Sequence, residues 1–113
     1  MKSKRSKWCD ISPRTRREVL VRDGARCINC GSTSYITLAH IFVNRSHGGK
    51  GSRDNLVCLC RNCHYYLLDN PIGEKQNMES KTIMNKCKNY LVKTEHITNV
   101  DVLIDRLKYK KGL

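Results

Sequence analysis

Two pairs of cysteines in the middle of this chain have the residue type and the spacing of a metal site. Cys27 and Cys30 form the first pair, and Cys60 and Cys63 form the second. Two CxxC units supply the four thiolates that a structural Zn²⁺ ion binds in a tetrahedron. We therefore predict one zinc ion on these four side chains, which would tie together segments that are far apart in a short chain.

Three further polar residues lie beside or between the pairs, and their side chains suit phosphodiester hydrolysis. They are His40, Asn55 and His64, and His64 directly follows the last cysteine of the zinc site. Hydrolysis of a phosphodiester needs a base that takes a proton from water, and charge stabilisation on the phosphate. His40 is an imidazole that is largely neutral near pH 7, as such a base must be. Asn55 has both donor and acceptor groups with which it can hold a loop in place.

The elements that position these residues follow from residue type and periodicity. Pro13 suits the first turn of a helix and Gly24 suits its end, while residues 35–41 are rich in β-branched and aromatic side chains. Apolar residues recur at helical spacing in the last third of the chain. We predict a helix over 13–23, a strand over 35–41, a long loop over 43–54, a strand over 55–59, a helix over 61–68, a linker over 73–77, and helices over 78–92 and 100–109.

Composition narrows the class of protein. The net charge of +12 favours a polyanionic partner, and the first 26 residues alone carry nine Lys and Arg against three acids. Charged residues interrupt every apolar run, so we expect no signal peptide, no membrane segment and a cytoplasmic location. Paired CxxC units favour a reducing compartment, and we interpret Cys9, Cys58 and Cys87 as buried or free thiols.

With these residues in order, the chain resembles the HNH (His-Asn-His) endonuclease family over about residues 14–70. The resemblance rests on the two Cys pairs, the strand segments around His40 and Asn55, and the helix that begins near Cys63. The upstream segment 9–13 and the glycine-bearing loop 48–51 are similar to a subgroup found often in phages and prophages. This resemblance implies a bacterial host cell as the location. The resemblance implies a single α+β domain over 1–113, with a ββα-metal (His-Me finger) core at about 14–70. A basic N-terminal arm (1–13), an N-terminal helix and a helical C-terminal extension (about 76–110) would flank this core.

The same resemblance implies roles for the individual residues. His40 would be the base, Asn55 would hold the loop, and His64 would bind a catalytic divalent ion, Mg²⁺ or Mn²⁺ with Ni²⁺ or Zn²⁺ as alternatives. The product ends would be 5′-phosphate and 3′-hydroxyl, and the helix that starts near Arg61 would enter or flank the minor groove. DNA is the expected partner, with low sequence specificity and with nicking or double-strand cleavage. The basic residues expected to contact its backbone are Arg14, Arg16, Arg17, Arg45, Lys50, Arg53 and Arg61.

One position departs from the family pattern. Many relatives carry Asp or another ligand just before the base His, whereas this chain has Ala39, whose methyl group binds no metal. His47, Asp69 or water molecules are the possible substitutes. Five residues of α-helix turn through about 500°, so Asp69 is expected on a face about 140° from His64 unless the helix has ended.

Ala39 also leaves room for other functions. A zinc-stapled DNA-binding module without catalysis is the main alternative, because a decaying site would lose a ligand first. A third is an interaction domain whose C-terminal helices bind a phage packaging protein or a second copy of the chain. The apolar stripes at 83–91 and 100–107 fit either a core or such a surface.

Overall fold

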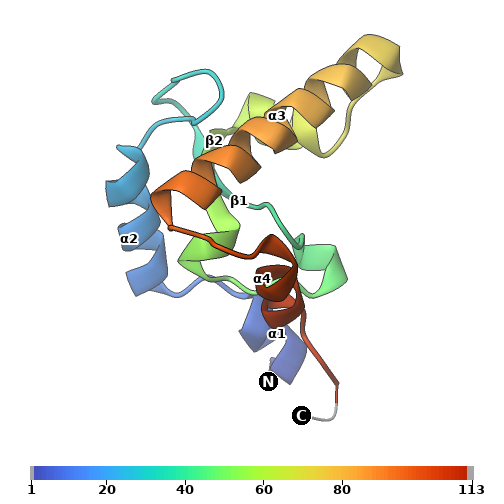
Figure 1. Cartoon of the computed structure of the whole chain (residues 1–113). Coiled ribbons are helices and arrows are strands. Elements are labelled where there is room, and N and C mark those ends of the chain that lie inside the picture. The colour runs from blue at the N-terminus through green and yellow to red at the C-terminus, as the bar shows by residue number, and fades with distance from the viewer. Residues whose placement is uncertain (1, 112–113) are drawn as a thin grey trace.

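The chain folds around a two-stranded antiparallel sheet that has helices on both faces (Figure 1), and the computed structural model describes residues 2–111. β1, β2 and η3 form the ββα core of an α+β fold, and the remaining helices surround it. The fold class is therefore as predicted. The elements are α1 (Lys4–Cys9), α2 (Pro13–Asp23), β1 (Ile36–His40), η1 (Arg45–His47), η2 (Arg53–Asn55), β2 (Leu56–Cys60), η3 (Asn62–Leu68), α3 (Gly73–Thr94) and α4 (Val100–Leu107).

The sheet is a hairpin whose register places the polar residues at its ends. Ile36 pairs with Cys60 and His40 pairs with Leu56, so the zinc ligands lie near one end and His40 at the other. All five residues of β2 are buried, because helices cover both sides of it. Both strands lie within one residue of their predicted positions.

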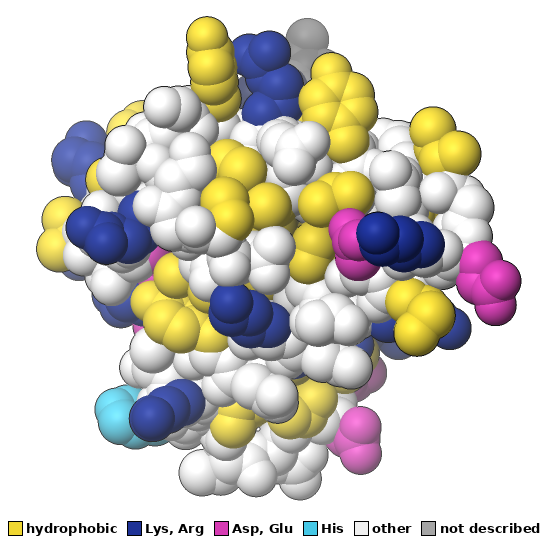
Figure 2. Space-filling view, turned by 90° about the horizontal axis from the view of Figure 1, so that it is seen from above, with side chains coloured by type: hydrophobic (Ala, Val, Ile, Leu, Met, Phe, Trp, Pro, Cys, Tyr) yellow, Lys and Arg dark blue, Asp and Glu magenta, His cyan; other side chains and the backbone are white. Residues whose placement is uncertain are grey.

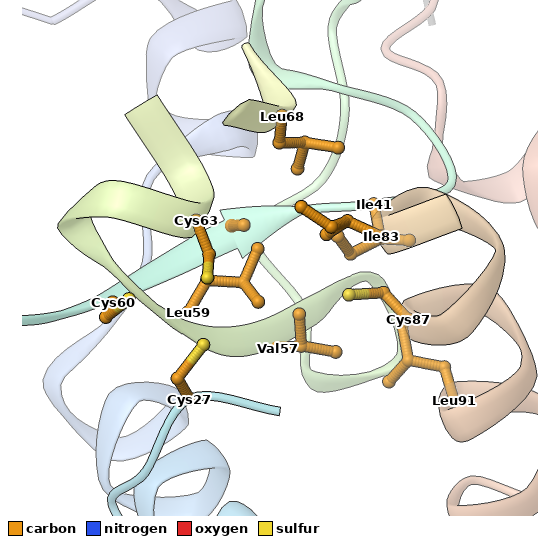
Figure 3. Packing of buried hydrophobic residues seen from close by; sticks show 11 residues of the cluster. Cys27, Ile41, Val57, Leu59, Cys60, Cys63, Leu68, Ile83, Cys87 and Leu91 are labelled. Atoms are coloured by element: carbon orange, nitrogen blue, oxygen red, sulfur yellow. The ribbon is translucent and has the colours of Figure 1, made fainter. Parts of the chain in front are cut away.

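Each face of the sheet packs against a different helix. On one face Val19 of α2 packs with Leu38, Leu56 and Cys58. On the other face the buried side chains of α3 meet Ala39, Val57 and Leu59. Figure 3 shows Ile83, Cys87 and Leu91 of α3 facing Val57 and Leu59 of β2. The sheet, α3 and three of the zinc-site cysteines thus share one hydrophobic core.

The ends of α2 follow from its sequence as predicted. The Ser12 side chain accepts a hydrogen bond from the Thr15 N–H, and Pro13 occupies the first turn. Gly24 then closes the helix in the left-handed conformation, with φ of 69°.

The basic arm carries a helix that the sequence did not reveal. Residues 4–9 form α1, capped by the Ser3 side chain, which accepts from the Ser6 N–H. The indole N–H of Trp8 donates to the Leu107 carbonyl at 2.9 Å, so α1 lies beside α4 at the bottom of Figure 1. The arm is therefore docked on the C-terminal end of the described chain.

The linker predicted over residues 73–77 is wrong, because α3 runs without interruption from Gly73 to Thr94. The segment is polar, yet Glu, Lys and Gln are good helix formers. Gly73 supplies the turn into the helix with φ of 78°, and the Gln76 side chain accepts from the Ile72 N–H at 2.8 Å. This local capping starts the helix one turn earlier than the apolar periodicity does.

The apolar stripes of the last two helices pack against other parts of the same chain. Ile83, Cys87 and Leu91 are buried against the sheet, while Leu103 and Leu107 of α4 pack on Val43. Of the two roles open to these stripes, the structure gives them the role of core. Cys9, Cys58 and Cys87 are buried free thiols, as expected.

A buried polar cluster fastens α3 to the rest of the molecule. The Asp23 carboxylate, 5% exposed as a residue, accepts from the Cys58 N–H at 2.8 Å and from the Tyr90 hydroxyl at 2.6 Å. The Arg22 guanidinium binds the same carboxylate and also reaches Glu95. The cluster joins α2, β2 and α3, so the position of α3 relative to the core is fixed.

Within residues 2–111, no helix combines the length and the apolar character that crossing a bilayer requires.

Candidate active site and zinc centre

The four predicted cysteines converge on one point. The ligand atoms of Cys27, Cys30, Cys60 and Cys63 all lie within 4.8 Å of one another, and the Cys30 and Cys60 sulfurs are 3.6 Å apart. Thiolates about 2.3 Å from a tetrahedral Zn²⁺ lie about 3.8 Å from each other. Among the described residues this is the one set of three or more His, Cys, Asp or Glu side chains close enough to hold a metal ion. The donor set and its spacing fit zinc.

Hydrogen bonds around the sulfurs favour the thiolate form that binds zinc. The Cys30 N–H points at the Cys27 sulfur at 3.4 Å, and the Asn29 side-chain amide donates to the Cys63 sulfur at 3.3 Å. Burial raises the pKa of Cys27, but backbone N–H groups of Cys60, Cys30 and Asn29 outweigh it and lower this pKa to about 7. These donors favour the thiolate at Cys27, whereas burial outweighs the Asn29 hydrogen bond and raises the pKa of Cys63.

The orientation of His64 is fixed by a hydroxyl group on β1. The Thr37 hydroxyl lies 2.7 Å from the Leu59 carbonyl oxygen and 2.8 Å from Nδ1 of His64. A carbonyl only accepts, so the single hydroxyl proton goes to Leu59, and Nδ1–H of His64 must donate to Thr37. The neutral ring therefore carries its lone pair on Nε2. Tyr65 stacks on the ring at 4.5 Å between centroids.

Asp69 is the neighbour of that free nitrogen. Its Oδ2 lies 3.3 Å from Nε2 of His64, and the Asp69 N–H donates to the His64 carbonyl at 3.0 Å. That backbone bond spans five residues, as in a π-helix, and η3 is π-helical from Asn62 to Leu68. The expectation that Asp69 lies on another face is wrong, because it assumed α-helical turn angles. Of the three possible substitutes for a ligand at position 39, Asp69 is the protein group beside His64, whereas His47 is exposed on η1.

His40 is held in the opposite way. Its Nε2 lies 3.0 Å from the backbone carbonyl oxygen of Cys9, which can only accept, so Nε2 carries the proton and Nδ1 the lone pair. Burial lowers the pKa of His40, and the nearby Arg45 and His64 lower it further. The hydrogen bond to the Cys9 carbonyl raises this pKa but does not outweigh burial. The ring is therefore neutral near pH 7, as a base must be. Cys9 belongs to the arm, and because its contact is a backbone atom, no residue type could have indicated it.

Asn55 is fully used by the loop that follows β1. Its Oδ1 accepts from the N–H groups of Phe42 and Val43 at 2.8 and 3.1 Å. Its Nδ2 donates to the carbonyls of Val43 and Lys50 at 2.8 and 3.0 Å. The side chain is 0% exposed and has no group left for a substrate. Asn55 is thus a positioning residue that closes the loop next to His40.

The two histidines share a cleft of about 540 Å³, which Asp69 and Arg45 also line. Asp69 is half exposed there, while the His64 side chain is 13% exposed. Ala39 does not take part, because it is buried in the core that α3 covers. The cleft therefore brings together two imidazoles of complementary tautomer, one carboxylate and one guanidinium.

The other predicted DNA contacts are dispersed. Arg53 binds Glu18 and Glu95, so its charge is used between α2 and α3. Lys50 lies 4.7 Å above the ring of Trp8, outside the cleft. Arg14 pairs with Glu18, Arg61 lies over Tyr35, and Arg16 and Arg17 are exposed on α2.

Comparison with known proteins identifies the core. Residues 27–66 match the family model described as HNH endonuclease. This segment is similar to the HNH endonuclease family. The matched HNH segment includes the four cysteines, His40, Asn55 and His64, whereas Cys9, Asp69 and α3 lie outside it. No curated protein and no solved structure shows a significant match to the chain.

Loss of the zinc site should unfold the core. Binding of a structural zinc ion contributes on the order of 10 kcal/mol, which is comparable to the whole stability of a small domain. We expect Cys60→Ser to lose its bound zinc and its cooperative thermal transition, measured by elemental analysis and circular dichroism. Cys87→Ser alters a buried cysteine outside the cluster and should keep one zinc per chain. A Cys60→Ser protein that melts like the wild type would contradict the assignment.

Proposed function

We propose that the protein is a metal-dependent HNH endonuclease that hydrolyses phosphodiester bonds in DNA. The observation that carries this proposal is that one ring nitrogen of each histidine lies against a protein oxygen at a shared cleft, which assigns a tautomer to each ring. The lone pair is then on Nδ1 in His40 and on Nε2 in His64, because each opposite nitrogen donates to a protein oxygen; Nε2 of His64 lies 3.3 Å from Oδ2 of Asp69. A base and a metal ligand are the two uses of a neutral imidazole nitrogen that hydrolysis requires.

His40 acts through Nδ1 in this account. Nδ1 takes a proton from the attacking water while Nε2–H remains bonded to the Cys9 carbonyl. That carbonyl also stabilises the positive charge on the ring once Nδ1 is protonated. Water adds to phosphorus as the bond to the 3′ oxygen breaks, and this oxygen takes a proton from solvent, which leaves 5′-phosphate and 3′-hydroxyl ends. Arg45 pairs with Asp10, but its side chain is half exposed at the cleft edge, where it attracts the phosphate.

His64 and Asp69 would hold the catalytic ion. Two donors about 2.1 Å from an octahedral ion and at a right angle lie about 3 Å apart, close to the 3.3 Å between Nε2 and Oδ2. Water and the phosphate would complete the coordination, as Mg²⁺ in particular allows. A bound divalent ion supplies charge neutralisation on the scissile phosphate. Asp69 thereby replaces the ligand that Ala39 does not provide.

The substrate follows from the surface. The net charge of +12 supplies affinity for the backbone of either strand. Lys and Arg side chains are spread singly over the face in Figure 2 rather than gathered in one block. Contacts of this kind position the backbone but carry no sequence information, so low sequence specificity is expected.

The second candidate function is a zinc-stapled DNA-binding module without catalysis. Ala39 favours it, because this position is sealed in the core and offers no ligand. It would use the same charge and the same zinc site. The two candidates differ in whether plasmid is cut.

The cleavage assay separates these candidates. Supercoiled plasmid is incubated with wild type, His40→Ala and His47→Ala, each with Mg²⁺, Mn²⁺, Ni²⁺ or chelator. We expect metal-dependent cleavage by wild type, and a rate about 10²- to 10⁴-fold lower for His40→Ala, since a general base is lost. His47→Ala removes an exposed imidazole that does not line the cleft and should cleave normally. Plasmid that is bound but uncut in every metal would support the binding module instead.

The pH dependence reports the protonation of His40. The base works only when neutral, and burial lowers its pKa from the usual 6.5, so its neutral form extends to lower pH. With saturating metal, we expect the single-turnover rate to hold down to about pH 6.5 and to fall below it. A rate that already falls above about pH 7 would contradict a depressed pKa.

Asp69→Asn tests the metal assignment. The amide keeps the shape of the side chain but removes its charge, so half-maximal cleavage should need about 10- to 100-fold more Mg²⁺. Asp105→Asn removes an exposed carboxylate that pairs with Lys110 and should leave the metal requirement unchanged. An unchanged requirement in Asp69→Asn would mean that water alone replaces the ligand missing at Ala39.

A further inference from the structure

A second hollow continues the cleft along α3. It measures about 530 Å³, and it shares His40, Asn44 and Asp69 with the cleft of the two histidines. Its remaining wall is formed by Leu68 and by residues of α3, among them Lys81, Asn85 and Lys88. A strand whose phosphate sits at the histidines therefore has a path past Asp69 and onto α3.

The α3 residues on this path share one side of the helix. Lys81, Asn85 and Lys88 are spaced at i, i+4 and i+7, which places them on one face. Seven residues of helix cover about 10.5 Å, while each DNA strand carries one charge about every 3.4 Å of helix axis. The two lysines can thus face different phosphates of one strand.

The charge of these lysines is not neutralised inside the protein. Among the described residues neither Lys81 nor Lys88 forms a salt bridge, in contrast to Arg22, Arg53 and Lys110. Asp69 is the one carboxylate that lines the second hollow, and it lies at the end shared with the histidines. A positive wall that leads away from the hydrolytic site matches a polyanion.

The helix that carries the lysines is held rigidly. Ser80 Oγ donates to the Leu68 carbonyl at 2.9 Å, and Lys86 Nζ donates to the Asn29 carbonyl at 2.9 Å on the zinc knuckle. Ile83 and Cys87, on the buried side, pack into the core. The positions of Lys81 and Lys88 relative to His40 are therefore set by the fold.

We infer that α3 is a second DNA-binding wall of the active site, with Lys81 and Lys88 bound to phosphates of the strand next to the scissile bond. This inference rests on the proposed function, since it takes the cleft of His40 as the place of the scissile phosphate. The wall lies outside residues 27–66, so it is a feature of this chain beyond its HNH segment.

The test is the salt dependence of DNA binding. The protein carries His40→Ala to prevent cleavage, and its affinity for a labelled duplex is measured at several salt concentrations. Each phosphate contact contributes about 0.9 to the slope of log K against log salt. We expect Lys81→Gln/Lys88→Gln to reduce this slope by about 2, and each single variant to reduce it by about 1.

The matched control is Lys75→Gln/Lys93→Gln. It removes the same charge from the same helix, at two exposed positions that do not line either hollow of the active site. This pair should leave the slope unchanged. Equal slopes in both double variants would overturn the inference, whether both fall together or neither does.

Cleavage by the wild type and by the same lysine variants with His40 intact distinguishes the two proposals. A wild type that cuts plasmid while Lys81→Gln/Lys88→Gln keeps its salt slope would refute the second wall alone. A slope that falls as expected, in a protein that never cuts, would refute the nuclease and keep α3 as a DNA-binding surface.

Discussion

The convergence of four cysteine sulfurs within 4.8 Å is the constraint on which the active site depends. Cys60 ends β2 and Cys63 lies in the first turn of η3, so a zinc ion there fixes how the π-helix leaves the sheet. His64 is the next residue, and its ring then meets Thr37 on β1. A structural metal site thereby determines the direction of the imidazole that we propose as a ligand of the catalytic ion.

The tautomer of each imidazole is set by a neighbouring oxygen that has no proton to donate to it. The Cys9 carbonyl holds His40 directly, and the Leu59 carbonyl holds His64 through the Thr37 hydroxyl. The two lone pairs are thus on different nitrogens in a cleft that the rings share. The absence of a ligand at position 39 is compatible with this design, because the π-helical backbone brings Asp69 to the free nitrogen of His64.

Much of this arrangement could be predicted from residue types. The paired cysteines indicated zinc, the β-branched segments indicated the hairpin, and Pro13 with Gly24 gave the limits of α2. Backbone partners could not be predicted, since the carbonyl of Cys9 is present whatever its side chain. Nothing in the seven residues of η3 indicated a π-helix rather than an α-helix. Because the expectation for Asp69 assumed an α-helix, it was wrong. The linker over 73–77 failed because capping by Gln76 is local, whereas the prediction relied on apolar spacing.

The tautomers themselves are the most direct test of this account. Long-range ¹H–¹⁵N correlation spectra of the zinc-bound protein, with His40→Ala and His64→Ala for assignment, report which ring nitrogen carries the proton in each imidazole. The account predicts Nε2–H for His40 and Nδ1–H for His64 above the pKa of both rings. Nδ1–H in His40, or Nε2–H in His64, would contradict it, because the base or the metal-binding nitrogen would then be blocked.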